Sequence, residues 1–259
     1  MAALVMLIVV ALPVRGEGAT CGEEARRGLE IHYDYRRIGG RDPLLSGPGE
    51  GQKYDERGWE KVIWTEGYRK KVKWIESEIP DPSLLEGGED SPADLESIAR
   101  FMSGRRRVRV ERLITRVRAP EWRYTVTDTL IGGRHDIQGR VRYHRRKRSH
   151  RFAGSISPSS DGDGSERVPM EEIAGVACRM ERSEVRGDHV ITRCVARIMG
   201  EEWDLLYRVD RGGSLLAGAE LEKRATRIEV DRCVPLAEFA VPEPPAGARW
   251  RVEGEPGRR

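Results

Sequence analysis

The sequence predicts a mainly β protein: a strongly curved antiparallel sheet, forming a half-barrel or open barrel, with one or two short helices. Three observations predict this fold. Apolar and polar residues alternate in many short segments, which is the period of a half-buried strand. Turn residues such as Gly, Pro and Asp separate these segments at short intervals. The chain of 259 residues is long enough for one large β domain, and its acidic and basic charges nearly balance.

The N-terminal segment indicates export. An apolar run over residues 1–14 is too short to cross a bilayer, which takes about 20 helical residues. We therefore expect a signal peptide over residues 1–19, cleaved after Gly16 or Ala19, and a periplasmic or secreted location. Because no Lys or Arg precedes the run, an uncleaved signal anchor is the alternative.

The rest of the chain is expected to form one antiparallel β domain over residues 20–240, followed by a loose tail rich in Pro and Gly over 241–259. In the first half, Leu29 to Ile38 alternates as one strand. A hairpin is expected from Trp59 to Trp64 and from Tyr68 to Ile75, around the turn Thr65-Glu66-Gly67.

A helix is expected next, since Ser91 is a suitable N-cap before Pro92 and Gly104 suits the end. Three strands follow, over Val108 to Val117, Trp122 to Ile131 and Ile137 to Phe152. In the first of them the apolar phase changes between Val110 and Leu113, which we interpret as a β-bulge. The stretch Ser155 to Ser165 has the composition of a loop.

The second half continues as a meander of short strands. Arg186-Gly187-Asp188 is a turn signal midway along Val176 to Ile198, which predicts a hairpin there. The later strands are expected at three places: Trp203 to Val209, Ser214 to Leu221 and Ala225 to Val230.

The four cysteines predict two disulfides, because an even number in an exported chain is typical of an oxidised protein. The hairpin places Cys178 opposite Cys194, which leaves Cys21 to bond Cys233 and to join the N-terminus to the last strand. Acylation of Cys21 is the less favoured alternative, since Gly18 stands where such signals carry an aliphatic residue. A zinc site lacks any close Cys or His spacing.

The C-terminal third resembles a known family. The string from Ile173 to Cys178, the strand pair through Ile198, the meander from Trp203 to Val230 and the closing segment Pro235 to Pro242 are similar to the periplasmic lipoprotein-carrier (LolA/LolB-like) superfamily. The resemblance implies a curved half-barrel covered by helices, whose apolar concavity holds an acyl chain or another lipid. This chain departs from the pattern in having one convincing helix.

Aromatic side chains are the candidate walls of that concavity. We expect Trp64, Trp74, Trp203 and Tyr207 to line it, as aromatic residues commonly line ligand pockets. The alternative is that these side chains pack in the core.

A basic run supplies candidate anion contacts. Arg145, Arg146 and Arg148 suit phosphate oxygens, such as those of lipid head groups at a membrane surface. An exported protein does not meet nucleic acid, so no nucleic-acid partner is expected. A solvated strand end is the alternative.

No catalytic motif, metal site or cofactor site is predicted. No two of the five histidines have helical i, i+4 spacing, and the chain has no nucleophile elbow, phosphate loop or dinucleotide fingerprint. Asp161-Gly162-Asp163-Gly164 matches a calcium loop only in part. Two functions therefore remain: an exported carrier of a lipid or lipoprotein acyl chain, and a domain of the cell envelope that binds another protein without a small ligand.

Overall fold

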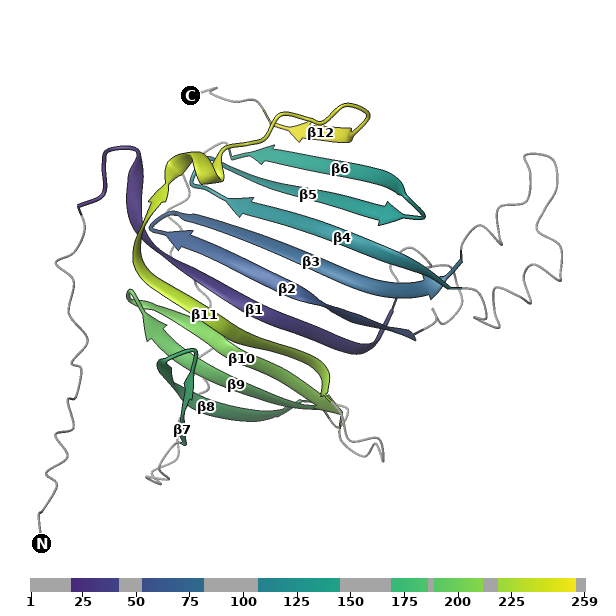
Figure 1. Ribbon diagram of the computed structural model, residues 1–259. Coiled ribbons are helices and arrows are strands. Elements are labelled where there is room, and N and C mark those ends of the chain that lie inside the picture. Colours follow the sequence, from purple (N-terminus) through teal and green to yellow (C-terminus); the bar gives the residue numbers. More distant parts are fainter. Residues whose placement is uncertain are drawn as a thin grey trace, which may run out of the picture.

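The computed structural model describes residues 20–41, 53–81, 107–144, 169–185, 189–211 and 219–254. Its twelve strands form one sheet, in the order β12-β6-β5-β4-β3-β2-β1-β11-β10-β9-β8-β7 (Figure 1). The sheet is not closed, because β12 and β7 are its two edges. All neighbouring strands are antiparallel except β12 and β6, which are parallel. The fold is therefore mainly β and mostly antiparallel, as predicted.

The strand bounds follow the alternation of the sequence closely. They are β1 Ala25–Arg41, β2 Lys53–Thr65, β3 Tyr68–Pro80, β4 Arg107–Arg118, β5 Trp122–Ile131, β6 Arg134–Tyr143, β7 Met170–Ile173, β8 Val176–Val185, β9 His189–Ile198, β10 Glu201–Arg211, β11 Ala219–Pro235 and β12 Arg249–Glu253.

The centre of the sheet joins the two halves of the chain. β1 pairs with β2 on one side and with the late strand β11 on the other. Cys21 bonds Cys233 across a sequence separation of 212 residues, close to where β1 begins. The predicted tie between the N-terminus and a late strand is confirmed.

The hairpin of β2 and β3 is also confirmed. Thr65 pairs with Tyr68, and the intervening Gly67 has a φ of +82°, a conformation that glycine adopts without the steric cost of a side chain. The cysteine hairpin forms from β8 and β9, and Cys178 bonds Cys194. Its register pairs Cys194 with Met180, so the disulfide runs diagonally between the strands.

Two predictions about strand regularity are wrong. β4 pairs with β3 and β5 without any shift of register, so it has no bulge. Its apolar phase changes because Val110 packs on one face of the sheet and Val117 on the other. The expected break between Leu221 and Ala225 is also absent, because both residues belong to β11, which pairs with β1 without any register shift between them.

The C-terminal segment and the helices differ from the expectation as well. Within 241–259, where a loose tail is expected, Arg249–Glu253 forms β12. The described residues contain no α-helix, and Leu236–Phe239 forms a single 3-10 turn. The helix expected after Ser91, the loop from Ser155 and the signal peptide over 1–19 lie outside the described residues.

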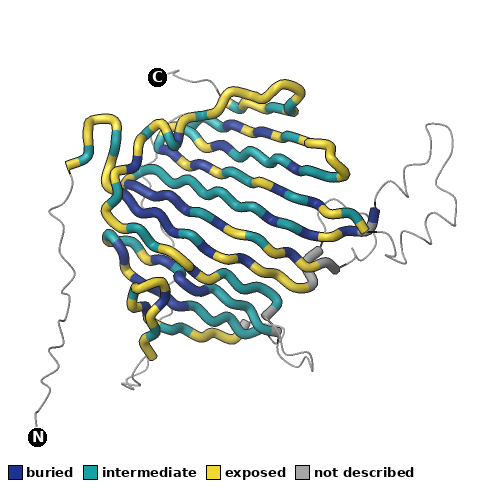
Figure 2. The backbone as a smooth tube through the Cα atoms, viewed as in Figure 1, coloured by how far each residue is buried: buried dark blue, intermediate teal, exposed yellow. Residues whose placement is uncertain are grey.

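Alternation along the strands gives the sheet two different faces. Buried and exposed residues alternate along much of the sheet (Figure 2). The face that carries Trp64 is named here the Trp64 face, and the opposite one, which carries Trp59, the Trp59 face. On the Trp64 face a core cluster surrounds Leu29, Ile31 and Trp203. A second cluster, which contains Ile63 and Phe239, lies on the Trp59 face.

Candidate functional site

The structure separates the four aromatic residues expected to line a concavity. The rings of Trp64 and Trp203 lie 6.1 Å apart, edge to face, although β1 and β11 separate their strands. Both are almost fully buried. Tyr207 is half-buried on β10 and pairs with Lys223 of β11. Trp74 pairs with Trp59, so it lies on the opposite face of the sheet.

The Trp64 face carries a row of arginines on adjacent strands. Trp64 of β2 lies opposite Arg69 of β3, and from there Arg118, Arg123 and Arg142 follow on β4, β5 and β6. We call these four residues the arginine row. Because adjacent strands are about 4.8 Å apart, the row spans about 14 Å. Like charges directly opposite each other destabilise a sheet, so this register has an energetic cost.

A second row of cations lies two residues further along the same strands. It contains Lys71, Arg116, Arg140 and Arg251, with Thr125 between the second and third. A hollow of about 300 Å³ lies over the two rows. Its lining is Arg116, Val117, Arg118, Arg123, Tyr124, Thr125, Arg140 and Arg142. A second hollow of about 530 Å³ shares Arg140 and Thr125 with the first.

Carboxylates are few on this part of the sheet. Among the described residues, no acidic side chain pairs with Arg116, Arg118 or Arg123, and all three are exposed. Arg140 and Arg142 both donate to Glu253 of β12. The middle of the arginine row is therefore a concentrated positive charge that an anion from solution can reach.

Arg69, at the inner end of the arginine row, is half-buried, and its Nε is fully buried. The guanidinium of Arg69 lies 5.1 Å from the centre of the Trp203 ring, as in a cation–π contact. Burial lowers the pKa of Arg69, and Arg118 lowers it further, although Tyr33 and Glu60 act in the opposite direction. Among the described residues no carboxylate pairs with this half-buried guanidinium, and a partly desolvated cation without such a partner is costly.

Two hydrogen-bond donors at that contact have no acceptor among the residues that the structure describes. Arg69 Nε and Trp203 Nε1 are both buried, and neither has a hydrogen-bond partner within the part of the chain that the structure describes. Buried donors are nearly always paired, by protein, water or a ligand. The pair therefore identifies a place where an oxygen acceptor would be stabilised.

A cluster of buried charges lies beside this end of the row, on the same face. Glu60 accepts from Lys71 at 3.1 Å and from Lys223 at 3.2 Å. Burial raises the pKa of Glu60, but the two lysines outweigh burial and the net shift is downward. Lys73 lies 3.2 Å from the centre of the Tyr35 ring, and burial lowers its pKa to about 8. These charges hold β1, β2, β3 and β11 together.

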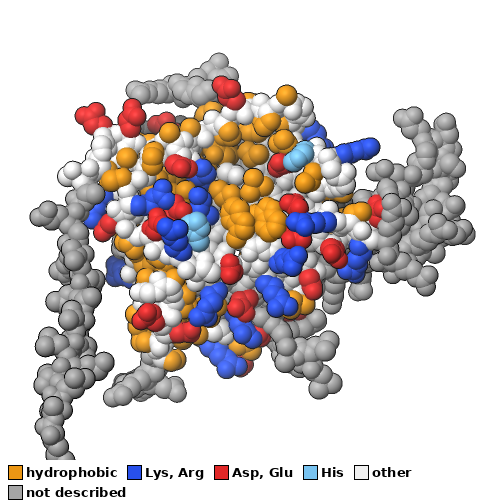
Figure 3. All heavy atoms as spheres, viewed as in Figure 1, with side chains coloured by type: hydrophobic (Ala, Val, Ile, Leu, Met, Phe, Trp, Pro, Cys, Tyr) orange, Lys and Arg blue, Asp and Glu red, His pale blue; other side chains and the backbone are white. Residues whose placement is uncertain are grey.

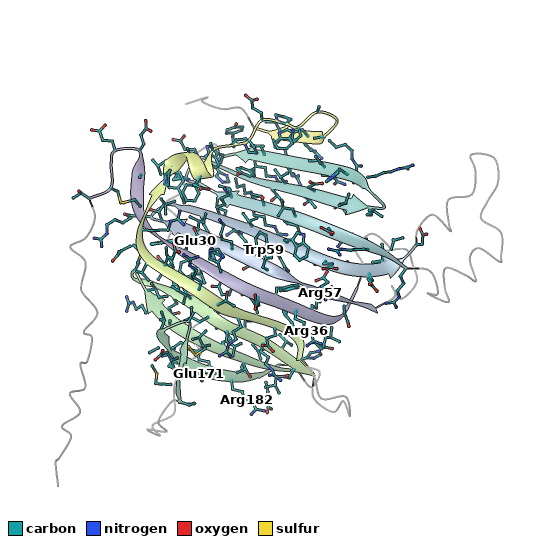
Figure 4. All side chains as sticks on the ribbon, in the orientation of Figure 1. Glu30, Arg36, Arg57, Trp59, Glu171 and Arg182 are labelled. Carbon is teal, nitrogen blue, oxygen red and sulfur yellow. A yellow bond between two sulfur atoms is a disulfide. The ribbon has the colours of Figure 1, made fainter. Side chains whose placement is uncertain are left out.

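The Trp59 face is different in character. Figure 3 views this face, where basic, acidic and hydrophobic side chains are interspersed, and Figure 4 labels Trp59 on it together with Glu30 and Arg57. Trp59 and Leu113 are each 40% exposed, and Trp74 lies between them in register. The arginine row is turned away from the viewer in both figures, by the alternation of side chains.

Both disulfides are present, which is typical of proteins that fold in an oxidising compartment. Arg145, Arg146 and Arg148 lie outside the described residues. Among the residues that are described, no cluster of His, Cys, Asp and Glu could hold a metal ion. They also include no helix with the length and apolar character needed to span a bilayer.

The arginine row was not predicted from the sequence. A signal for it exists, because Arg116 and Arg118 on β4, like Arg140 and Arg142 on β6, are two residues apart and so share one face of a strand. The alignment of these pairs across four strands depends on register, which the sequence pattern does not specify.

Comparison with models of protein families, with curated proteins and with solved structures gives no match. The similarity to the lipoprotein-carrier superfamily therefore stays a prediction.

Proposed function

We propose that this protein binds an anionic amphiphile outside the cytoplasm, with the anionic head group on the arginine row and the acyl chain along the apolar part of the same, curved face. In this proposal the protein is a periplasmic or secreted binding protein for a lipid or lipoprotein acyl chain. In this proposal it acts by holding the ligand and has no catalytic role. Contact with a membrane surface supplies the ligand.

The observation that carries the proposal is one line of residues across the sheet. From Leu29 and Trp64 the register leads to Arg69, and then through Arg118 to Arg123. Apolar and cationic side chains thus adjoin on one face, in the order that an acyl chain and its head group require. Ligand pockets commonly combine apolar walls with a few converging polar groups.

The chemistry of the cationic part favours phosphate. Guanidinium groups donate in bidentate fashion to phosphate oxygens, and such charge-assisted hydrogen bonds are roughly twice as strong as neutral ones. Arg118 and Arg123 are exposed and pair with no carboxylate among the described residues, so within that part of the chain their donors are open to a ligand. Arg69 Nε and Trp203 Nε1 add two donors at the buried end.

Three ligands test the proposal when titrated calorimetrically into the purified mature protein. Dodecyl phosphate carries both features of the proposed ligand, inorganic phosphate only the head group and dodecyl maltoside only the chain. We expect dodecyl phosphate to bind at least tenfold more tightly than either of the others, because both parts of the site contribute. Equal affinity for inorganic phosphate would reduce the site to a simple anion site. Equal affinity for dodecyl maltoside would remove the arginine row from recognition.

A matched pair of variants locates the binding. Arg123→Gln removes from the arginine row one exposed charge that pairs with no acidic side chain in the described part of the chain. Arg109→Gln makes the same change on the Trp59 face, where Arg109 pairs with Glu76 and Glu111. We expect about a tenfold loss of affinity for dodecyl phosphate in the first variant and less than a twofold change in the second. Native mass spectrometry of the wild-type protein adds an independent readout, the mass of any co-purified lipid.

The exposed apolar residues of the Trp59 face favour a second function, binding of another envelope protein. Trp59 and Leu113 lie two strands apart with Trp74 between them, and such clusters commonly mark protein contacts. A photo-crosslinking residue at position 59, compared with one at position 123, tests this in cells. A specific protein adduct from position 59 alone would support it, and no adduct from either position would refute it.

A further inference from the structure

The last strand of the chain places a carboxylate on the arginine row. Glu253 of β12 lies opposite Arg142 of β6, in parallel register. One of its oxygens accepts from Arg140 Nε at 2.8 Å, and the other accepts from Arg142 Nε. Arg251 approaches the first oxygen at 3.2 Å. The hydrogen bond from Arg140 is the largest cause that holds the pKa of Glu253 below its usual value; burial opposes it, and the hydrogen bond from Arg142 and the charges of both arginines add to the lowering.

Contacts on both faces of the sheet fix β12 in this place. On the Trp59 face Trp250 lies against Gly139 so closely that a Cβ at that glycine would meet the indole at 2.1 Å. On the Trp64 face Arg249 donates to both oxygens of Asp136, at 2.7 Å and 2.6 Å. The strand has only five residues and a parallel pairing, so these side chains supply much of its attachment.

We infer that Glu253 is a built-in competing anion, whose carboxylate occupies the outer end of the ligand site and must turn away before a phosphate head group engages Arg140 and Arg142. This inference rests on the proposed function and deepens it. Of the cations that line the first hollow, Arg140 and Arg142 donate to Glu253, whereas Arg116, Arg118 and Arg123 pair with no acidic side chain among the described residues. The site is therefore part occupied by the protein's own carboxylate and part open.

The competition sets a threshold on the ligand. A ligand with a single carboxylate gains little by displacing Glu253, because it replaces one carboxylate with another that is not tethered beside the arginines. A phosphate monoester has more acceptor oxygens and up to two negative charges, so it can engage Arg118 and Arg123 first and then displace Glu253. Competition with Glu253 therefore favours doubly charged head groups over singly charged ones.

The substitution Glu253→Gln tests the inference, since it keeps the size of the side chain and removes its charge. With dodecyl phosphate as the probe and ionic strength held constant, we expect about tenfold tighter binding than in the wild-type protein, as one charge-assisted pair no longer has to be broken. Glu253→Asp keeps the charge but shortens the reach to the arginines, and we expect about threefold tighter binding.

Asp136→Asn is the matched control. Asp136 also pairs with an arginine on the Trp64 face, and its loss changes the net charge by the same amount and loosens the same strand. We expect less than a twofold change in affinity. The inference is overturned if Glu253→Gln binds dodecyl phosphate no more tightly than the wild-type protein. It is also overturned if Asp136→Asn increases the affinity equally, because the change in net charge alone would then explain the effect. Failure of the wild-type protein to bind dodecyl phosphate would instead refute the proposed function.

Discussion

The guanidinium of Arg69 lies 5.1 Å from the centre of the Trp203 indole, although three strands separate β3 from β10 in the sheet. Side chains from distant strands therefore converge over the Trp64 face. The contact also joins the two parts of the proposed site, because Arg69 ends the arginine row and Trp203 belongs to the apolar cluster around Trp64. A row of cations leading into an apolar core is the feature on which the functional argument depends.

Loss of an arginine from the row is expected to stabilise the free protein. In Arg123→Gln the like-charge contacts with Arg118 and Arg142 disappear, which should raise the free energy of unfolding by about 0.2–1 kcal/mol at low salt. Thermal unfolding of the free protein measures this. A gain in stability together with weaker binding of dodecyl phosphate is typical of residues kept for function. A clear loss of stability would mean that the row has a structural role.

Trp203 and Trp59 should differ strongly in their contribution to stability. Trp203 is 5% exposed and contacts both Trp64 and Arg69, so Trp203→Ala should destabilise the protein by about 3–5 kcal/mol. Trp59 is 40% exposed, and Trp59→Ala should cost about 1 kcal/mol or less. Urea denaturation of both variants checks the difference. Similar values for the two would contradict the burial of Trp203.

Lys73 should make stability rise with pH in the alkaline range. Burial lowers its folded-state pKa to about 8 from 10.5, against the opposing effects of Glu56 and Glu60. Between these values the unfolded chain binds the proton more fully than the folded one, so the free energy of unfolding increases as the pH rises through that window. Urea denaturation from pH about 8 to about 10 measures this slope. Above pH 10.0, the ordinary pKa of tyrosine, the raised pKa values of Tyr33 and Tyr35 make the free energy of unfolding fall again, so the range ends there.

The variant Lys73→Met should remove most of that slope and stabilise the protein near neutral pH by about 1 kcal/mol, a figure reduced to allow for solvent screening. Lys70→Met is the control, because Lys70 pairs with Glu238 at 2.8 Å on the other face of the sheet. An unchanged slope in Lys73→Met would exclude this lysine as its source.

The two disulfides should differ in how readily they are reduced. Cys178 and Cys194 are 1% and 0% exposed, whereas Cys233 is exposed and Cys21 partly so. Because thiol–disulfide exchange needs access to a sulfur, mild reductant should open the bond between Cys21 and Cys233 first. Alkylation followed by peptide mapping at increasing reductant gives the order. Loss of that bond should cost about 3–5 kcal/mol, since it closes a long loop.

Much of the fold could be predicted from the sequence, because alternation and turn residues are local signals. The bounds of β5 match the prediction fully, and the hairpin of β2 and β3 turns at the expected Gly67. The disulfides followed from the cysteine count and one turn. The pattern failed where both faces of a strand are half-buried, as in β4, and where short alternating pieces merge, as in β11.

The candidate site was less accessible to sequence reasoning. The sequence predicted that Trp64 and Trp203 line one apolar site together with Trp74. The register places Trp74 on the other face of the sheet. The arginine row depends on the pairing of Arg69 with Arg118 and of Arg118 with Arg123. A shift of one residue in any of these pairings would send a guanidinium to the Trp59 face.

The sequence by itself determined most of the segments that become strands, the alternation along them and the bond between Cys178 and Cys194, because these follow from backbone period and turn chemistry within a few residues. Only the tertiary structure decided that β1 lies between β2 and β11, that Trp64 meets Trp203, and that four arginines stand side by side. The physical reason is that strand order and register are set by hydrogen bonds and packing between segments far apart in the chain. The local alternation of apolar and polar residues does not specify these pairings.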